Sequence, residues 1–272
     1  MFSLRKSDFR GPNGVWTLRD KGTLNILGRI AERFYPTFTH YSITELVRQG
    51  LVGYVISTNM DALHARSGLP VHLLNEQHGN KHKERCERCS KDYYRQFDTL
   101  KTVNSPRGHL TGRNCTFCGE RLRDSIVHFS EFVRPEEVMT AMYNSRKCDL
   151  AVVLGTSMNV QPAASFPDKC FKNGGKLVII NLQKTPFDSL ASIRIFAKTD
   201  DVMRMLMEEL HIHRFDVETD LIDTWDPHPD AEEEEESLLD YLGGLVTPSV
   251  VGFGILSFVC GIFVARALTR SP

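Results

Sequence analysis

Two Cys-x-x-Cys pairs constrain the fold of this chain more than any other feature of its sequence. The four cysteines are Cys86, Cys89, Cys115 and Cys118. Each two-residue spacing forms a tight turn that points both sulfur atoms at one ion, and four thiolates complete the tetrahedral shell that zinc prefers. The sequence therefore predicts one structural zinc ion in a small module, with residues 90–114 as the excursion between the pairs.

Composition places few limits on the partners of this chain. The 272 residues carry a net charge of −1, which gives no signal for direct nucleic-acid binding. The sequence opens with MFSLRKSDFRG, which has no apolar stretch typical of a signal peptide. We therefore expect reduced thiols, which favours metal binding over disulfide formation.

His78 precedes the first cysteine pair in the stretch NEQHGNKHKERCERC. Histidine is a common zinc ligand, so metal binding is one role for it. Because four thiolates already fill a zinc shell, the other role is a side chain left free for chemistry beside the metal site. The residues alone leave both roles open.

Three short apolar runs predict buried strands of a parallel sheet. They cover residues 51–57, 150–155 and 176–181. Nearly continuous apolar runs are typical of strands that helices cover on both faces. Helical patterns occur at residues 42–50 (with Ser42 and Glu45 as a capping box), 134–147 and 199–210. This alternation predicts an open α/β sheet that binds its ligands at the carboxyl ends of the strands.

Small and polar residues follow each of these strands. They are Asn59 and Asp61 after the first strand, Gly155, Thr156 and Ser157 after the second, and Asn181, Leu182 and Gln183 after the third. Such residues let the sugar and phosphates of a nucleotide approach the backbone. Each one is equally typical of a plain loop or a helix cap.

The C-terminal part of the sequence predicts a membrane anchor. Residues 242–265 contain no charged side chain and are long enough to cross a hydrocarbon core as a helix. An acidic linker, residues 213–241, precedes this span, and Arg266 follows it. We therefore expect a tail-anchored protein whose large domain faces the cytosol or nucleoplasm, where the thiols stay reduced.

Taken together, the motifs resemble those of the sirtuins, the NAD-dependent protein deacylases. They occur in family order from about residue 7 to 212: DFRGPNGVW, STNMDALHARSGLP, HGN, both cysteine pairs, LRDSIVHFSE, LGTSMNVQP and VIINLQKTPFD. Several, TGRNCTFCG among them, are most similar to the class IV nuclear and nucleolar members. The resemblance implies an incomplete Rossmann-like NAD-binding domain, residues 1–78 and 125–212, with an inserted four-cysteine zinc module, residues 79–124.

The resemblance also implies a mechanism with His78 as the general base. In the family, the acyl-lysine oxygen attacks the ribose of NAD and expels nicotinamide. The histidine then activates a ribose hydroxyl, which carries the acyl group away as O-acyl-ADP-ribose. An imidazole suits this step because its ordinary pKa lies near the working pH.

Other roles are carried over from the resemblance residue by residue. The flexible loop over the cofactor is assigned Phe9, Arg10 and Trp16, and the nicotinamide and ribose pocket Asn59 and Asp61. The ADP-ribose part is assigned Gly155, Thr156, Ser157, Asn181, Leu182 and Gln183. The segment that pairs with the substrate peptide as an added strand is assigned Ile126, Val127, His128 and Phe129. Zinc is assigned the four cysteines and NAD is the implied cofactor.

The sequence departs from the family in the cofactor site. It contains no Gly-Ala-Gly-x-Ser phosphate loop or first strand, which predicts a bare edge on the neighbouring strand. It has Thr58 where the family has glutamine, Ala62 for glycine and Gln77 for an apolar residue. Two functions remain: a membrane-tethered deacylase of acylated lysine in proteins, with histones and other nuclear proteins as family-type substrates, or a catalytically weak or inactive remnant that binds peptide or nucleotide. Nuclear envelope, endoplasmic reticulum and mitochondrial outer membrane all fit the anchor.

Overall fold

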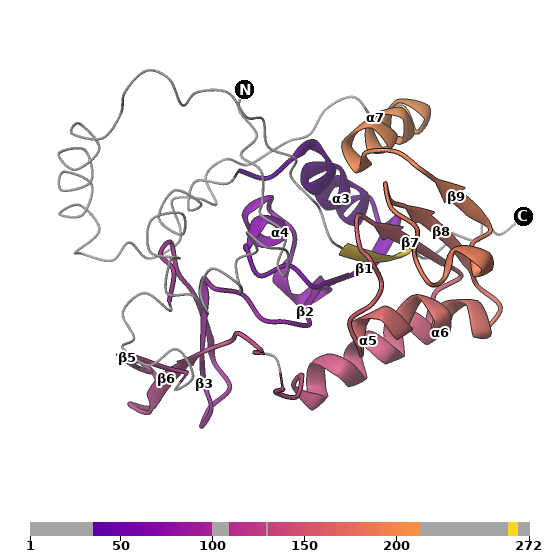
Figure 1. Ribbon diagram of the computed structural model, residues 1–272. Coiled ribbons are helices and arrows are strands. Elements are labelled where there is room, and N and C mark those ends of the chain that lie inside the picture. The colour runs from indigo at the N-terminus through magenta and orange to yellow at the C-terminus, as the bar shows by residue number, and fades with distance from the viewer. Residues whose placement is uncertain (1–34, 100–108, 129, 213–260, 266–272) are drawn as a thin grey trace, which may run out of the picture. The chain divides into compact units, whose positions relative to one another are not determined.

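The computed structural model describes residues 35–99, 109–128, 130–212 and 261–265, the last as backbone alone. The larger of two sheets has six strands in the order β2-β1-β10-β7-β8-β9 (Figure 1). These are β1 Val52–Ser57, β2 Leu74–Glu76, β7 Leu150–Leu154, β8 Lys176–Ile180, β9 Ile193–Ile195 and β10 Gly261–Ala265. Neighbouring strands other than β10 run parallel, so the predicted α/β class is confirmed.

Helices cover both faces of this sheet. They are α3 Phe38–Arg48, α4 Leu63–Arg66, α5 Pro135–Lys147, α6 Phe166–Lys172 and α7 Thr199–Glu209, with short 3-10 turns at Val71–Leu73, Ala163–Ser165 and Asp188–Leu190. Figure 1 shows α3 and α7 on one side and α5 and α6 on the other. Side chains of β8 point alternately to the two faces of the sheet. Leu177 packs in the hydrophobic cluster that contains Phe166, and Ile180 packs in the cluster that contains Ile43.

The helix starts show where local sequence signals were sufficient. Pro135 occupies the first turn of α5, as its sequence predicts. The predicted cap at Ser42 is wrong, because α3 begins one turn earlier with Thr37 as its cap. The partner of Thr37 is the side chain of His40, which bonds back to the Thr37 N–H at 3.1 Å. The pair is a capping box closed by histidine. The usual pattern, which requires glutamate or glutamine three residues after the cap, does not detect it.

Residues 261–265, predicted as the end of a transmembrane helix, instead form β10 in the centre of the large sheet. β10 pairs antiparallel with both β1 and β7, so its backbone groups bond to two strands and not along a helix. The edge of β1 that was expected to be bare therefore carries a partner strand. Residues 213–241 and 242–260, the rest of the predicted linker and span, lie outside the described residues.

Within the part of the chain that the structure describes, no helix has the length and apolar character needed to cross a membrane. The predicted tail anchor, with its membrane localisation and membrane partner, is thus contradicted. The prediction rested on hydropathy, and an apolar run without charge is also typical of a strand in the centre of a covered sheet.

The second sheet belongs to the cysteine module and has the order β4-β3-β6-β5. Its strands are β3 Lys83–Cys86, β4 Asp92–Tyr94, β5 Leu110–Asn114 and β6 Arg121–Asp124. Glu84 of β3 is fully buried and lies 2.8 Å from Nε of Arg95 and 2.7 Å from Nε of Arg113. The hydroxyl of Thr111 also donates to this carboxylate. The module therefore has a polar centre in which a buried charge is paired on several sides.

The position of β10 predicts that proline is not tolerated in it. Phe263 pairs with Val55 of β1 and Val152 of β7. Phe263→Pro removes a ladder N–H inside a sheet and should lower the free energy of unfolding by about 2 kcal/mol or more. Urea denaturation of the full chain measures this, with Phe263→Ile, which keeps the N–H, as the control. Equal midpoints for the proline variant and the wild type would contradict a central β10.

Candidate functional site

The carboxyl ends of β1 and β7 lie at one edge of the sheet. Because both strands pair antiparallel with β10, they run in the same direction. Ser57, the last residue of β1, and Leu154, the last residue of β7, both pair with Gly261. The loops that begin at Thr58 and Gly155 therefore leave the sheet at the same level, at the point where chain order reverses and α/β sheets bind ligands.

The two loops predicted to hold ADP-ribose are bonded to one another. The N–H of Gly155, which has a positive φ of 60°, donates to the carbonyl of Ile180 at 2.9 Å. The Asn181 amide donates to the Thr156 carbonyl and to the Gln183 carbonyl, each at 3.0 Å. The structure thus brings residues 155–157 and 181–183 together. Asn181 is a buried link between the loops, and Leu182 is exposed.

Arg194 of β9 holds the loop of residues 181–183 through its backbone carbonyls, a role that the sequence did not indicate. Its guanidinium donates to the Asn181 carbonyl at 2.9 Å and also to the Gln183 carbonyl. Its Nε lies 2.9 Å from Oδ1 of Asp188. Desolvation alone would raise the pKa of Asp188, but hydrogen bonds from Thr185, together with the bond and charge of Arg194, keep it below its usual range. The conformation of residues 181–183 is therefore fixed by a guanidinium that is itself paired with a carboxylate.

Asn59 and Asp61 occupy the loop after β1, and both are 9% exposed. The Asn59 N–H donates to the Ser57 hydroxyl at 3.1 Å, and Oδ1 of Asp61 accepts from the Leu63 N–H at 3.1 Å. Among the described residues, the Asn59 Nδ2 amide has no hydrogen-bond partner. Since buried donors are almost always bonded, this amide fits a polar group of a bound cofactor such as NAD.

His78 lies in the turn after β2, beside the loop of Asn59. The Gln77 N–H donates to the Ser57 carbonyl at 2.9 Å, and the Lys81 N–H donates to the Met60 carbonyl at 3.0 Å. Burial lowers the pKa of His78, and a hydrogen bond with the Thr58 backbone offsets only part of that effect. The ring is therefore neutral near pH 7 and able to accept a proton.

The turn at His78 also touches the predicted substrate segment. Gly79 has a φ of 77°, and a Cβ built on it would lie 1.8 Å from the carbonyl oxygen of Ser125. The Val127 N–H donates to the His78 carbonyl at 3.0 Å. Residues 126–128 thus run alongside the candidate base. The other predicted members of these groups, Phe129, Phe9, Arg10 and Trp16, lie outside the described residues.

Three buried side chains that sequence reasoning missed support this turn. Glu76 accepts a bond from Asn80 Nδ2 at 2.8 Å through one oxygen and lies 2.7 Å from Lys83 Nζ through the other. The Ser125 hydroxyl lies 2.9 Å from both the N–H and the carbonyl of Asn80. In the sequence, only Asn80 of the HGN motif pointed to this arrangement. Glu76 and Lys83 are seven residues apart, a spacing that by itself predicts no contact.

The four predicted metal ligands form one cluster. One sulfur each from Cys86, Cys89, Cys115 and Cys118 lies within 4.8 Å of the others. No other cysteine, histidine or acidic residue of the described ranges joins this cluster, and none of the six described cysteines is in a disulfide. The Tyr93 hydroxyl lies 3.1 Å from the sulfur of Cys115. The donor set fits a structural zinc ion, with the phenol as an outer hydrogen bond.

Comparison with known proteins agrees with this arrangement. The model of the Sir2 family matches residues 23–162, more than half of the chain. A rat protein, the NAD-dependent protein deacetylase sirtuin-7, is 44% identical over 211 residues and 75% of this chain. The Arabidopsis thaliana NAD-dependent protein deacetylase SRT1 is 40% identical over 208 residues and 75% of this chain. The chain spans 52% and 43% of these two relatives, about half their length.

A solved structure agrees in fold. A Sir2 complex with a p53 peptide and NAD+ has a TM-score of 0.59 and 31% identity. The match covers 76% of this chain and 88% of that one. The similarity therefore extends over most of a Sir2 domain that has been seen with both a peptide and NAD+.

If the four cysteines hold one zinc ion, zinc binding should require each of the four thiols. Cys115→Ser removes a thiolate, so zinc per chain should fall from one to near zero and the module should unfold. Elemental mass spectrometry and limited proteolysis of residues 80–124 measure the two effects. The control is Cys148→Ser, at a buried cysteine outside the cluster. A Cys115→Ser variant that keeps a full zinc complement would contradict the assignment.

The close approach of Gly79 to Ser125 predicts that a single added methyl group, in Gly79→Ala, strongly destabilises the fold. Gly79→Ala should lower the free energy of unfolding by more than about 2 kcal/mol, because backbone must move to relieve the clash. Gly50→Ala is a matched control, since Gly50 has a φ of 73° but no atom within 4 Å of the added carbon. That control should cost only the left-handed conformation, about 1 kcal/mol. Equal losses in the two variants, measured by chemical denaturation, would show that the contact with Ser125 is unimportant.

Proposed function

Because the chain belongs to the Sir2 family, we propose that it is an NAD-dependent protein lysine deacylase that releases nicotinamide and O-acyl-ADP-ribose. Its cofactor is NAD, and the four-cysteine cluster holds one structural zinc ion. Among family classes, the motif resemblance and the 44% identity to rat sirtuin-7 support a place with the class IV members. Acylated nuclear proteins, histones included, are then the substrate class to test first.

One observation carries the proposal. A neutral, half-buried histidine lies at the carboxyl edge of the sheet, bonded through its carbonyl to the Val127 N–H and adjacent through Gln77 to the loop of Asn59. A proton acceptor, a buried amide that fits a cofactor and the segment assigned to the substrate peptide thus lie next to one another. These are the three components that a deacylation with NAD requires.

The chain's own residues divide the work of the reaction. NAD, when bound, supplies the ribose carbon that takes the acyl oxygen and the nicotinamide that leaves. Asn59 and Asp61 hold the nicotinamide and ribose end, and residues 155–157 and 181–183 hold the ADP end. His78 takes the proton of a ribose hydroxyl on the unprotonated nitrogen of its neutral ring, which its lowered pKa allows at neutral pH. The zinc module supports the turn and takes no part in proton transfer.

The protein substrate is recognised mainly through its backbone. Residues 126–128 directly follow Ser125 after the end of β6, and an extended peptide can add to such a backbone segment as a further strand. Backbone bonds supply affinity without strict demands on sequence, which suits an enzyme that acts on many acylated lysines.

Substitution of the candidate base tests the mechanism directly. His78→Tyr should abolish formation of nicotinamide and O-acetyl-ADP-ribose from NAD and acetylated peptide, because tyrosine is not a base near neutral pH. Zinc content should stay at one per chain, since His78 is outside the cysteine cluster. The matched control is His72→Tyr, at an exposed histidine of a 3-10 turn, which should retain full turnover.

The pH dependence provides a second readout. A base must be unprotonated, so the rate should fall as the pH drops through the pKa of His78, which lies below the usual value of about 6.5.

Zinc loss in His78→Tyr would refute its place outside the metal shell. Folded, zinc-loaded wild-type chain that makes neither product would instead support the alternative, a binding module without turnover, for which Thr58 in the cofactor loop is the relevant departure from the family.

A further inference from the structure

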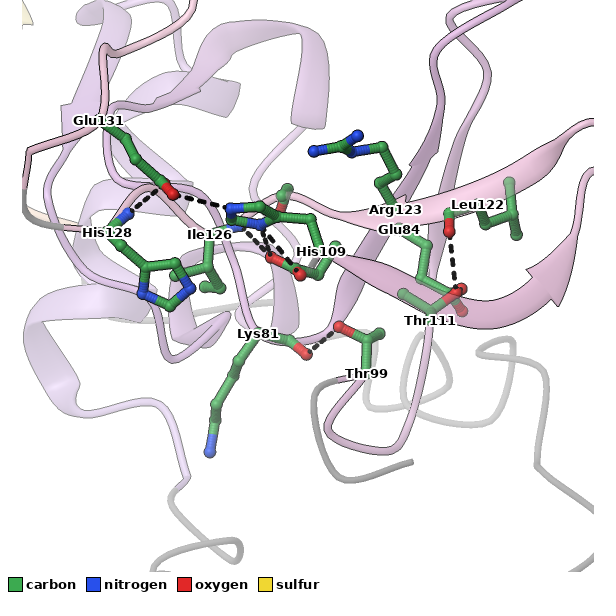
Figure 2. Close-up of polar contacts among 12 residues, drawn as sticks. Lys81, Glu84, Thr99, His109, Thr111, Leu122, Arg123, Ile126, His128 and Glu131 are labelled. Carbon is green, nitrogen blue, oxygen red and sulfur yellow. Dashed lines mark hydrogen bonds and ion pairs between the residues drawn. The ribbon is translucent and has the colours of Figure 1, made fainter. Parts of the chain in front are cut away.

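His109 connects the cysteine module to the candidate substrate segment. It immediately precedes β5, its backbone is left-handed with a φ of 55°, and its side chain is 12% exposed. Its Nδ1 lies 3.2 Å from both carboxylate oxygens of Asp124, and its Nε2 lies 3.0 Å from Oε1 of Glu131. Figure 2 shows the ring of His109 with Glu131 on one side. A single imidazole thus joins the end of β6 to the turn beyond residues 126–128.

The two carboxylates that contact this ring also bind the backbone of the segment. Oδ1 of Asp124 accepts the N–H of Ile126 at 2.8 Å. Oε2 of Glu131 accepts the N–H of His128 at 2.8 Å, and Figure 2 shows Glu131 bonded to both histidines. Each carboxylate therefore shares its oxygens between the imidazole and one backbone N–H of the segment. We call the set of His109, Asp124 and Glu131 the clasp.

The clasp and the candidate base bind successive residues of the segment. The N–H groups at 126 and 128 bond to the clasp, whereas the N–H of Val127, between them, bonds to the His78 carbonyl at 3.0 Å. A shift of the clasp would therefore move the segment relative to His78.

The geometry requires a charged ring at the centre of the clasp. An ionised carboxylate only accepts hydrogen bonds, and a neutral imidazole has one donor and one acceptor nitrogen. A ring that faces a carboxylate at each nitrogen satisfies both only when both nitrogens carry protons. Loss of one proton leaves a lone pair facing either Asp124 or Glu131, so deprotonation opens the clasp on one side.

The electrostatic surroundings agree with this geometry. Partial burial lowers the pKa of His109, but the bonds to Glu131 and Asp124 and their charges outweigh it and raise the pKa overall. The ring of His128 lies with its centroid 5.1 Å from that of His109. Arg123, the neighbouring charge on β6, is engaged in an ion pair with a glutamate of the first cysteine turn.

We propose that His109 and Glu131 are positioning residues for the acyl-lysine peptide: through the clasp they hold residues 126–128 in the conformation that receives it. The proposal rests on the proposed function, because it takes this segment as the peptide site. Neither side chain needs to touch the reacting atoms. The expected signature is therefore weaker peptide binding with NAD binding and the chemical step unchanged.

Two substitutions in the full chain test the clasp. Glu131→Gln and His109→Gln keep a polar side chain of similar reach and remove the charge. KM for an acetyl-lysine peptide, and its equilibrium Kd, should rise about three- to tenfold for a partly exposed charged pair. KM for NAD, kcat at saturating peptide and zinc content should stay unchanged. The double variant should be no worse than either single variant, because both break one clasp.

A matched control uses an exposed carboxylate remote from the site. Glu209→Gln, in the last turn of α7, makes the same chemical change and should leave every constant unchanged. Unchanged peptide KM and Kd in both clasp variants would overturn the proposal while leaving the deacylase function in place. Wild-type chain without turnover would refute the proposed function, and the peptide Kd would still decide the clasp. Wild-type chain that binds no peptide would overturn both.

The pH dependence of peptide binding separates the clasp from a purely structural role. The pKa of His109 is raised in the folded chain, so the contribution of its charge is present at low pH and is lost as the pH rises through that pKa. Peptide Kd for the wild type should therefore increase over this range, and His109→Gln should abolish the increase. A wild-type and a His109→Gln chain with the same pH profile would count against a charged clasp.

Discussion

The close approach of Gly79 to the backbone of Ser125 is the constraint on which the rest of the site depends. The cysteine module is an insertion whose two ends must return to the same place, and these residues are where they meet. A side chain at position 79 would occupy the position of the Ser125 carbonyl. Because the ends touch, the turn that carries His78 and the segment that begins at Ile126 leave the module together. The bond from Val127 to His78 follows from that geometry.

Buried charged groups next to this junction are paired with one another. Glu76 and Lys83 form an ion pair in which both side chains are less than a tenth exposed, and Asn80 completes the bonding of the carboxylate. Within the module, Glu84 is paired with two guanidinium groups. Breaking one partner of such a set leaves a buried charge uncompensated, which is more costly than the net contribution of the pair. The module is therefore held together by the cysteine cluster, by ion pairs and, next to Ser125, by the contacts of His109 with Asp124 and Glu131.

The large sheet shows how an apolar sequence can have two structural solutions. Residues 261–265 belong to a run whose hydropathy predicts a membrane helix, yet they pair with β1 and β7. Hydropathy measures only that a segment avoids water. The space between β1 and β7, in a sheet covered by helices on both faces, keeps a segment away from water as a bilayer does. The two strands also supply hydrogen-bond partners for its backbone groups. With β10 in place, the loops after Ser57 and Leu154 leave the sheet level with each other, which brings the two parts of the proposed cofactor site to one edge.

The sequence by itself determined the α/β class, the main strands, the start of α5 and the family, since these depend on local periodicity, turn chemistry and ordered motifs. It also singled out the four cysteines, because two short spacings limit where sulfur atoms can point. The cap of α3, the pairing of β10, the support of Asn80 by Glu76 and the contact of His109 with Glu131 were decided only by the tertiary structure. Each joins groups whose separation along the chain carries no signal, and only the folded backbone sets which donors and acceptors come within reach.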